Sequence, residues 1–301
     1  MRVRAPLITL GIVVALLAAF AAGAGLLLSD SSAPAGSSAS TAFTTLRGQT
    51  AILSGEGLYR YDTVFFAAGF RGQDTAVLLL GIPLLIGASW WYRGGSVGAQ
   101  LFLTSMLGYF LYLYASMALG AAYNPLFLLY VATFSASLFG FVLSFTAVDR
   151  QQLARRAPFL PHRALVIFMV LGGAITLVVW GMPLVAALLA DTPPARLDSY
   201  TTMVTYALDL AIITPGCFVC AYLVARRQSL GYVVAAPLLL LIALLAPQIM
   251  LSTYFQYAAG VPFSPGEMVG PVAGFTVLGL IAIWLLVSLL RRSGVRVAST
   301  A

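Results

Sequence analysis

The chain contains no lysine, and it has only one histidine and two cysteines among its 301 residues. A Schiff base to retinal or pyridoxal phosphate needs a lysine amine, so cofactors of that kind are excluded. His162 alone cannot supply paired haem ligands or a histidine-rich metal centre, and two cysteines are too few for a four-ligand zinc site. A nucleophile–histidine–acid triad is disfavoured for the same reason. We therefore expect no cofactor and no metal, and a non-enzymatic role is favoured over catalysis.

Charged side chains are also scarce, at 8% of the residues, whereas 61% are hydrophobic. Soluble domains contain roughly 25% charged residues. A chain of this composition needs the lipid bilayer as its solvent, and lipid offers no partner for backbone N–H and C=O groups. The alternating pattern of an outer-membrane barrel is absent. The sequence therefore predicts an all-α, polytopic transmembrane helical bundle.

Eight apolar stretches approach the roughly 20 residues that cross a 30 Å hydrocarbon core. The predicted spans are Leu7–Leu28, Thr75–Tyr92, Val97–Leu119, Pro125–Val148, Ala164–Ala190, Tyr200–Ala225, Gly231–Ser252 and Val269–Leu290. The first span, within residues 1–28, also resembles a signal peptide, and cleavage after Asp30 would leave seven spans. Its apolar run of about 22 residues favours an uncleaved anchor.

The arginines predict the orientation of these spans. With the amino terminus inside, twelve of the sixteen arginines lie on the inner side, as the positive-inside rule requires. Only Arg47, Arg60, Arg71 and Arg196 lie outside. The net charge of +7 is therefore a topology signal and an attraction to lipid headgroups, not a nucleic-acid patch. We expect a multi-pass protein of a bacterial cytoplasmic (inner) membrane with both termini in the cytoplasm.

The remaining parts of the chain are predicted from local composition. Residues 29–54 are rich in small polar residues and predict a flexible outer linker. Residues 55–74 mix aromatic and charged side chains and predict a short interfacial helix on the outer surface, capped by Asp62. Residues 75–290 form the seven-helix membrane bundle, and residues 291–301 form a cytoplasmic tail.

Two stretches of this chain resemble a known group of proteins. GLYRYDTVFFAAGFRGQD, followed by LLLGIPLLI and YFLYLYASMALGAAYNPLFLLYVATFSASLF, resembles uncharacterised multi-pass bacterial membrane proteins over Gly57–Phe139. The resemblance implies a bacterial inner-membrane protein. It carries no catalytic signature, so no activity or site residue is transferred from it.

Asp209 is the acid that the sequence places inside a span, near mid-membrane. A carboxylate there costs about 2.5–3.5 kcal/mol on insertion scales, so it needs partners, water or a proton. Thr205 and Tyr206 share its helix face, and Pro215 follows six residues later. An acid beside a broken helix is frequent in ion and substrate sites of transporters. The alternative is a hydrogen-bonded aspartate that only ties two helices together.

Polar stripes on two other spans favour one outward-facing cavity. Tyr109 and Tyr112 belong to a stripe on the third span, and Gln248 lies near the outer end of the seventh. We expect these side chains to line a cavity centred on Asp209, although such faces also serve as plain helix-packing contacts.

Two further features complete the candidate set. Arg60 and Arg71 are placed at the mouth of this cavity, where they would select charge, or else form local surface ion pairs. Cys217 and Cys220 form a CxxC pattern inside a span, which favours buried, inert thiols.

The leading hypothesis is binding and translocation of a small solute, proton or ion. The rival is a non-catalytic subunit or scaffold of a membrane complex, whose partner subunits the sequence does not name. A third class, an enzyme acting on lipid-linked substrates with outer carboxylates, ranks last because the soluble domain common in such enzymes is missing. The expected partners are the lipid bilayer and a small-molecule solute, with no nucleic acid.

Overall fold

The structure is a computed structural model that describes residues 4–28 and 42–294. In this part of the chain, eight helical stretches are long and apolar enough to cross a membrane. They are Arg4–Leu27, Val64–Tyr92, Val97–Gly120, Phe127–Thr146, His162–Leu189, Val204–Ala225, Ser229–Ala258 and Met268–Ser293. This confirms the predicted all-α bundle, and the chain is an integral membrane protein.

Six of the spans are single helices: α1 (Arg4–Leu27), α4 (Val97–Gly120), α5 (Phe127–Thr146), α7 (His162–Leu189), α10 (Ser229–Ala258) and α11 (Pro265–Gly294). The second span joins α2 (Val64–Ala76), the π-helix η1 (Val77–Gly81) and α3 (Ile82–Tyr92). The sixth joins α8 (Val204–Leu208), the π-helix η3 (Asp209–Ile213) and α9 (Thr214–Ala225). A short helix α6 (Arg150–Arg156) and a 3₁₀ turn η2 (Ala157–Phe159) connect α5 to α7.

Both π-helical turns come directly before a proline. The N–H of Thr214 donates to the carbonyl of Asp209, five residues back, and Pro215 follows. The N–H of Ile82 donates to Val77 in the same way before Pro83. A proline removes one helical N–H and crowds the preceding turn, so a widened turn keeps the helix continuous. Such turns are frequent at functional sites.

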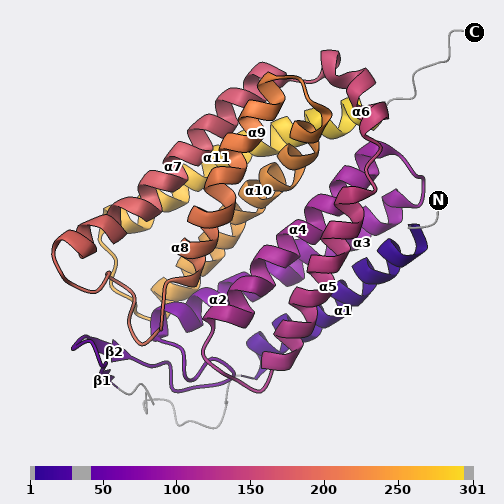
Figure 1. Cartoon of the computed structure of the whole chain (residues 1–301). Helices are drawn as coiled ribbons and strands as arrows, with labels where there is room; N and C mark the ends of the chain where they lie inside the picture. The colour runs from indigo at the N-terminus through magenta and orange to yellow at the C-terminus, as the bar shows by residue number, and fades with distance from the viewer. Residues whose placement is uncertain (1–3, 29–41, 295–301) are drawn as a thin grey trace, which may run out of the picture.

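Helices α4 and α10 lie at the centre of the bundle. In each of these two helices, 67% of the residues in the apolar stretch are buried, against 28–39% in the other spans. Apolar residues surround both helices rather than lying along one face, as expected for a helix enclosed by other helices. In Figure 1, α1–α5 form one group and α7–α11 the other, and α10 packs against both α2 and α4. The interface of α10 with α2 and α4 therefore joins the two groups.

The contact between α2 and α10 is close because α2 presents glycines there. A Cβ added to Gly72 would lie 2.7 Å from the carbonyl carbon of Leu251 and still nearer to the backbone of Ser252. One turn earlier, the hydroxyl of Ser252 donates to the carbonyl of Gly69 at 2.9 Å. Small residues let helix backbones approach in this way within membranes.

The end of the bundle that the sequence predicts to lie outside, called the outer end below, differs from the prediction in two places. Part of the expected flexible linker forms an antiparallel hairpin of β1 (Ala42–Thr44) and β2 (Thr50–Ile52), with Phe43 opposite Ala51. Figure 1 shows this hairpin at the end of the bundle opposite α6. Residues 29–41 of the linker and 295–301 of the tail lie outside the described residues.

The expected interfacial helix is the second difference. Residues 64–74 are the first part of the second span, because α2 continues into η1 and α3 without a break. Thr63, not Asp62, is the N-cap residue of α2, and no side chain caps this helix. The sequence-based boundary at Thr75 kept Arg71 and Asp74 out of the membrane, whereas the folded bundle gives Asp74 a buried partner.

Candidate functional site

Asp209 lies at the first position of η3, facing the central helix α4. Its Oδ1 accepts a hydrogen bond of 2.8 Å from the hydroxyl of Tyr112. The aspartate is buried, with 6% of its surface exposed. An acid at this position is therefore held by one neutral donor inside the bundle, without a cation beside it in the contacts of the described residues.

The position of Asp209 along its helix differs from the prediction. The helical part of the sixth span begins at Val204, four residues later than predicted, so Asp209 lies only about 8 Å below its outer end. About 24 Å of helix separates it from Ala225 at the other end. Residues 200–203 are turns and irregular backbone in the structure. The Asp209–Tyr112 pair thus lies in the outer half of the bundle.

Two buried hydroxyls flank the pair along the axis of the bundle. Ser116 lies one turn outward from Tyr112 on α4, and Thr214 lies one widened turn inward from Asp209. Neither hydroxyl has a hydrogen-bond partner among the described residues, and both are shielded from the surface. Buried polar groups are almost always satisfied, by protein or by water. These hydroxyls are therefore suited to bind water on either side of the carboxyl.

Tyr109 and Gln248 belong to a separate network. The hydroxyl of Tyr109 donates to Oε1 of Gln248 at 3.2 Å, and Nε2 of Gln248 donates to Oε1 of Gln73 at 3.2 Å. Further outward, Nε2 of Gln256 donates to the carbonyl of Phe65 at 3.1 Å. This row of contacts ties α10 to α2 and α4. The structure thus places these two candidate residues in helix packing, and no bond joins them to Asp209.

The other predicted site residues also lie apart from the carboxyl of Asp209. Thr205 is exposed, and Tyr206 packs on Trp180 of α7 with ring centroids 4.4 Å apart. Arg60 is exposed and lies over the ring of Tyr61 at 5.0 Å. Arg71, one turn before Asp74 on α2, acts electrostatically on that carboxyl rather than on Asp209.

Asp74 is a second acid inside a span, which the sequence analysis had placed outside. It is 5% exposed, and its Oδ2 accepts a hydrogen bond of 2.6 Å from the hydroxyl of Tyr59. Gly25 of α1 covers this pair, because a Cβ there would lie 2.7 Å from the Tyr59 hydroxyl and would collide with the carboxylate. The helix runs without a break through Val64–Tyr92, whereas the predicted span began at Thr75, one residue after Asp74.

Asp62 joins three segments of the outer end. Its Oδ1 accepts hydrogen bonds of 2.8 Å from the N–H of Ala122 and of 2.8 Å from the hydroxyl of Tyr200, while Oδ2 is buried without a partner. Burial raises the pKa of Asp62 from 3.8 to about 6. Burial, with the nearby carboxylate of Asp62, also raises the pKa of Tyr200. Arg47 adds a bond of 3.1 Å to the carbonyl of Tyr200. These contacts tie the segments around residues 47, 62, 122 and 200 together at the outer end.

The two thiols are buried within the bundle, whereas the surface hollows lie away from Asp209. Cys217 and Cys220 are free and buried, and Sγ of Cys220 lies 3.4 Å from the carbonyl of Gly231. In the described part of the chain, no cluster of three or more His, Cys, Asp or Glu could hold a metal ion. Two hollows of about 680 and 510 Å³ lie at the other end of the bundle, and neither is lined by Asp209 or Tyr112.

No protein-family model, curated protein or solved structure matches this chain.

Chemically, the Asp209–Tyr112 pair can take up and release a proton. A carboxyl hydrogen-bonded to one tyrosine is stable in its neutral form within the bundle, and its charged form needs water or a further donor. The arrangement offers one carboxylate and one hydroxyl oxygen, whereas a metal cation such as Ca²⁺ takes about 6–8 oxygen ligands.

Proposed function

We propose that this protein carries protons, alone or coupled to a small solute, across a bacterial inner membrane, with Asp209 as the proton-binding group. The observation that supports this most directly is a carboxyl buried among membrane-spanning helices whose hydrogen-bond donor is the neutral hydroxyl of Tyr112. Ionisable groups inside a membrane are costly, and they are retained where a pathway needs them.

The π-helical turn at η3 supports the same proposal. It begins at Asp209 itself and ends at the residue before Thr214. A widened turn frees a backbone carbonyl from the regular pattern and gives the helix a place to adjust. Movement at this turn would change the distance between Asp209 and Tyr112, which are held on different helices, and so change the affinity of the carboxyl for its proton.

The unpartnered hydroxyls of Ser116 and Thr214 supply the rest of the route. Water bound at Ser116 would connect Asp209 outward, and water at Thr214 would connect it inward. The contacts of Asp62 with Ala122 and Tyr200 hold three outer segments together, and these contacts would form the closure on that side. Opening of this closure would complete access from outside.

The orientation follows from the arginines. Both described ends of the chain, Arg4 and Gly294, lie at the end of the bundle that carries α6, and most arginines belong to that end. We place this end in the cytoplasm by the positive-inside rule. The hairpin and Asp62 then face the periplasm.

The test is proton flux into sealed vesicles. Purified full-length protein is reconstituted into liposomes that contain a pH-sensitive dye, and a potassium gradient with valinomycin supplies the driving potential. The wild-type protein should acidify the interior faster than empty liposomes. Asp209→Asn should reduce the flux to the level of empty liposomes, because an amide cannot exchange the proton. Asp191→Asn, at an exposed position in the loop after α7, is the matched control and should keep the wild-type flux.

Three further results separate this function from its rival. Ser116→Ala and Thr214→Ala should slow the flux while leaving the melting temperature near that of the wild type. If wild-type vesicles acidify no faster than empty ones, with or without candidate solutes, the proposal is refuted. If Asp209→Asn conducts normally but melts at a lower temperature, the aspartate is an interhelical contact, as a structural subunit would require.

A further inference from the structure

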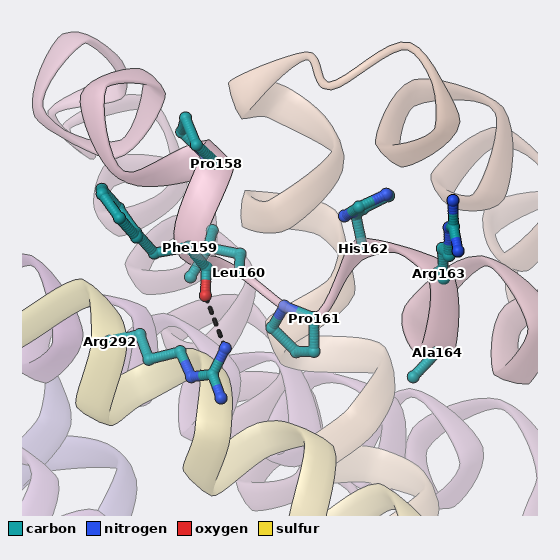
Figure 2. Close-up of a pocket in the computed structure, with 8 residues that line it drawn as sticks. All are labelled: Pro158, Phe159, Leu160, Pro161, His162, Arg163, Ala164 and Arg292. Atoms are coloured by element: carbon teal, nitrogen blue, oxygen red, sulfur yellow. Dashed lines mark hydrogen bonds between the residues drawn. The ribbon is translucent and has the colours of Figure 1, made fainter.

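A hollow of about 680 Å³ lies at the end of the bundle opposite the hairpin, where the α6–α7 connection meets the end of α11. Figure 2 shows the side chains that line it, among them Phe159, Pro161, His162, Arg163 and Arg292. None of its lining residues is acidic. The hollow therefore combines positive charge with apolar walls, and it is separate from the Asp209 site.

The position of Arg292 is fixed by contacts between α11 and the α6–α7 connection. Its guanidinium donates to the carbonyl of Phe159 at 2.6 Å, drawn as a dashed line in Figure 2. Its own carbonyl accepts a bond of 3.2 Å from Arg156, whose side chain is buried. One NH group of Arg292 is thus held by the protein, and the exposed guanidinium still has N–H donors that face outward.

The start of α7 adds positive potential to the same hollow. This helix has 28 residues, and His162, Arg163 and Ala164 of its first turn all line the hollow. The N-terminal end of a long helix carries a partial positive charge and free N–H groups. Together with the side chain of Arg163, which is exposed, it makes the hollow complementary to an anionic group.

A mostly apolar face of α11 adjoins this hollow. A second hollow of about 510 Å³ shares Arg292 with the first and is lined by Leu280, Ile283, Trp284, Val287, Ser288 and Arg291. These residues follow the i, i+3, i+4, i+7 spacing of one helix face, and Trp284 is 58% exposed. Arg291 and Arg292 therefore lie at the polar end of a helix face whose other lining residues, apart from Ser288, are apolar.

We propose that these two hollows bind one anionic phospholipid of the leaflet next to the chain termini. The phosphodiester lies against Arg163 and Arg292, and one acyl chain follows the face of α11 across Trp284. The occupant is a lipid rather than a soluble phosphate compound, because the charged hollow adjoins an apolar, exposed face of α11. Basic pockets between transmembrane helices are sites of this kind for anionic headgroups.

The test measures lipid retained by the purified full-length protein and the fluorescence of Trp284. The protein in mild detergent is mixed with equal amounts of phosphatidylglycerol and phosphatidylcholine, and bound lipid is counted by native mass spectrometry. Wild-type protein should retain phosphatidylglycerol selectively. Arg163→Gln, which breaks no hydrogen bond among the described residues, should lower this selectivity about fivefold, as expected for one arginine near an anionic headgroup. Arg150→Gln, on the exposed start of α6, is the matched control and should leave it unchanged.

The second readout places the acyl chain. Phosphatidylglycerol with brominated acyl chains should quench wild-type fluorescence more than brominated phosphatidylcholine does, and Trp284→Phe should remove that difference. Equal retention of the two lipids, or an equal loss in Arg163→Gln and Arg150→Gln, overturns the proposal. Displacement of the bound lipid by millimolar inorganic phosphate also overturns it, since the hollow would then be a site for soluble phosphate.

Discussion

The close packing of α2 on α10 makes a quantitative prediction about Gly72. Replacing it by alanine places a Cβ against the backbone of Ser252 and 2.7 Å from the carbonyl carbon of Leu251. Backbone atoms cannot rotate away as a side chain can, so the two helices must separate. Overpacking of this kind costs about 1–3 kcal/mol.

Separation of these helices also weakens the polar row between them. The bonds are Ser252 to Gly69 at 2.9 Å, Gln256 to Phe65 at 3.1 Å and Gln248 to Gln73 at 3.2 Å. Interhelical hydrogen bonds in membranes are worth about 0.6 kcal/mol each. We therefore expect Gly72→Ala to destabilise the bundle by about 3 kcal/mol in total.

The assay is reversible unfolding in mixed micelles or by steric trapping, with Gly87→Ala as the matched control. Gly87 belongs to the same span, and a Cβ there would meet nothing within 4 Å. Alanine favours helix over glycine by about 1 kcal/mol, so the control should be as stable as the wild type or more so. Equal stability of the Gly72→Ala and Gly87→Ala proteins would refute the close contact of α2 with α10.

Two further predictions concern the buried acids. Gly25→Ala should displace the carboxylate of Asp74 and break its bond to Tyr59, lowering the melting temperature, whereas Gly23→Ala, which meets nothing within 4 Å, should not; an equal effect of the two changes would contradict this packing. The raised pKa of Asp62, about 6 against 3.8, means that the folded protein binds this proton more tightly than the unfolded chain does. Acidification through about pH 6 toward pH 4 should therefore stabilise the outer end, by up to about 3 kcal/mol, and the gain is lost as the pH rises again. Asp62→Asn should flatten this part of the stability profile, and an unchanged difference from the wild type across the range would count against the assignment.

The membrane architecture could be predicted from the sequence because lipid allows few alternatives. A long apolar stretch in a bilayer must become a helix, so composition and length are enough to find eight spans. The hairpin at Ala42–Thr44 and Thr50–Ile52 was missed because two strands of three residues carry little hydrophobic pattern. The start of the second span was also missed, since hydropathy cannot show that Asp74 has a buried partner.

The candidate site shows the same limit. Hydropathy and spacing single out Asp209 and the stripe that contains Tyr109 and Tyr112, because polar residues are rare in these spans. Sequence alone cannot tell which tyrosine reaches the acid, since Tyr109 and Tyr112 are one turn apart. The structure brings Tyr112 to Asp209 and gives Tyr109 to Gln248. That choice depends on how α4 is rotated between α10 and the sixth span, which is a property of the assembled bundle.

The central place of α10 has a consequence for how the protein is made. Ribosomes deliver the spans in chain order, and α10 is the seventh of the eight. Until it arrives, Gln73 lacks its partner, and the glycine face of α2 has no helix to receive it. The contacts that join the two groups of helices through α10 can therefore form only after the first six spans have been inserted.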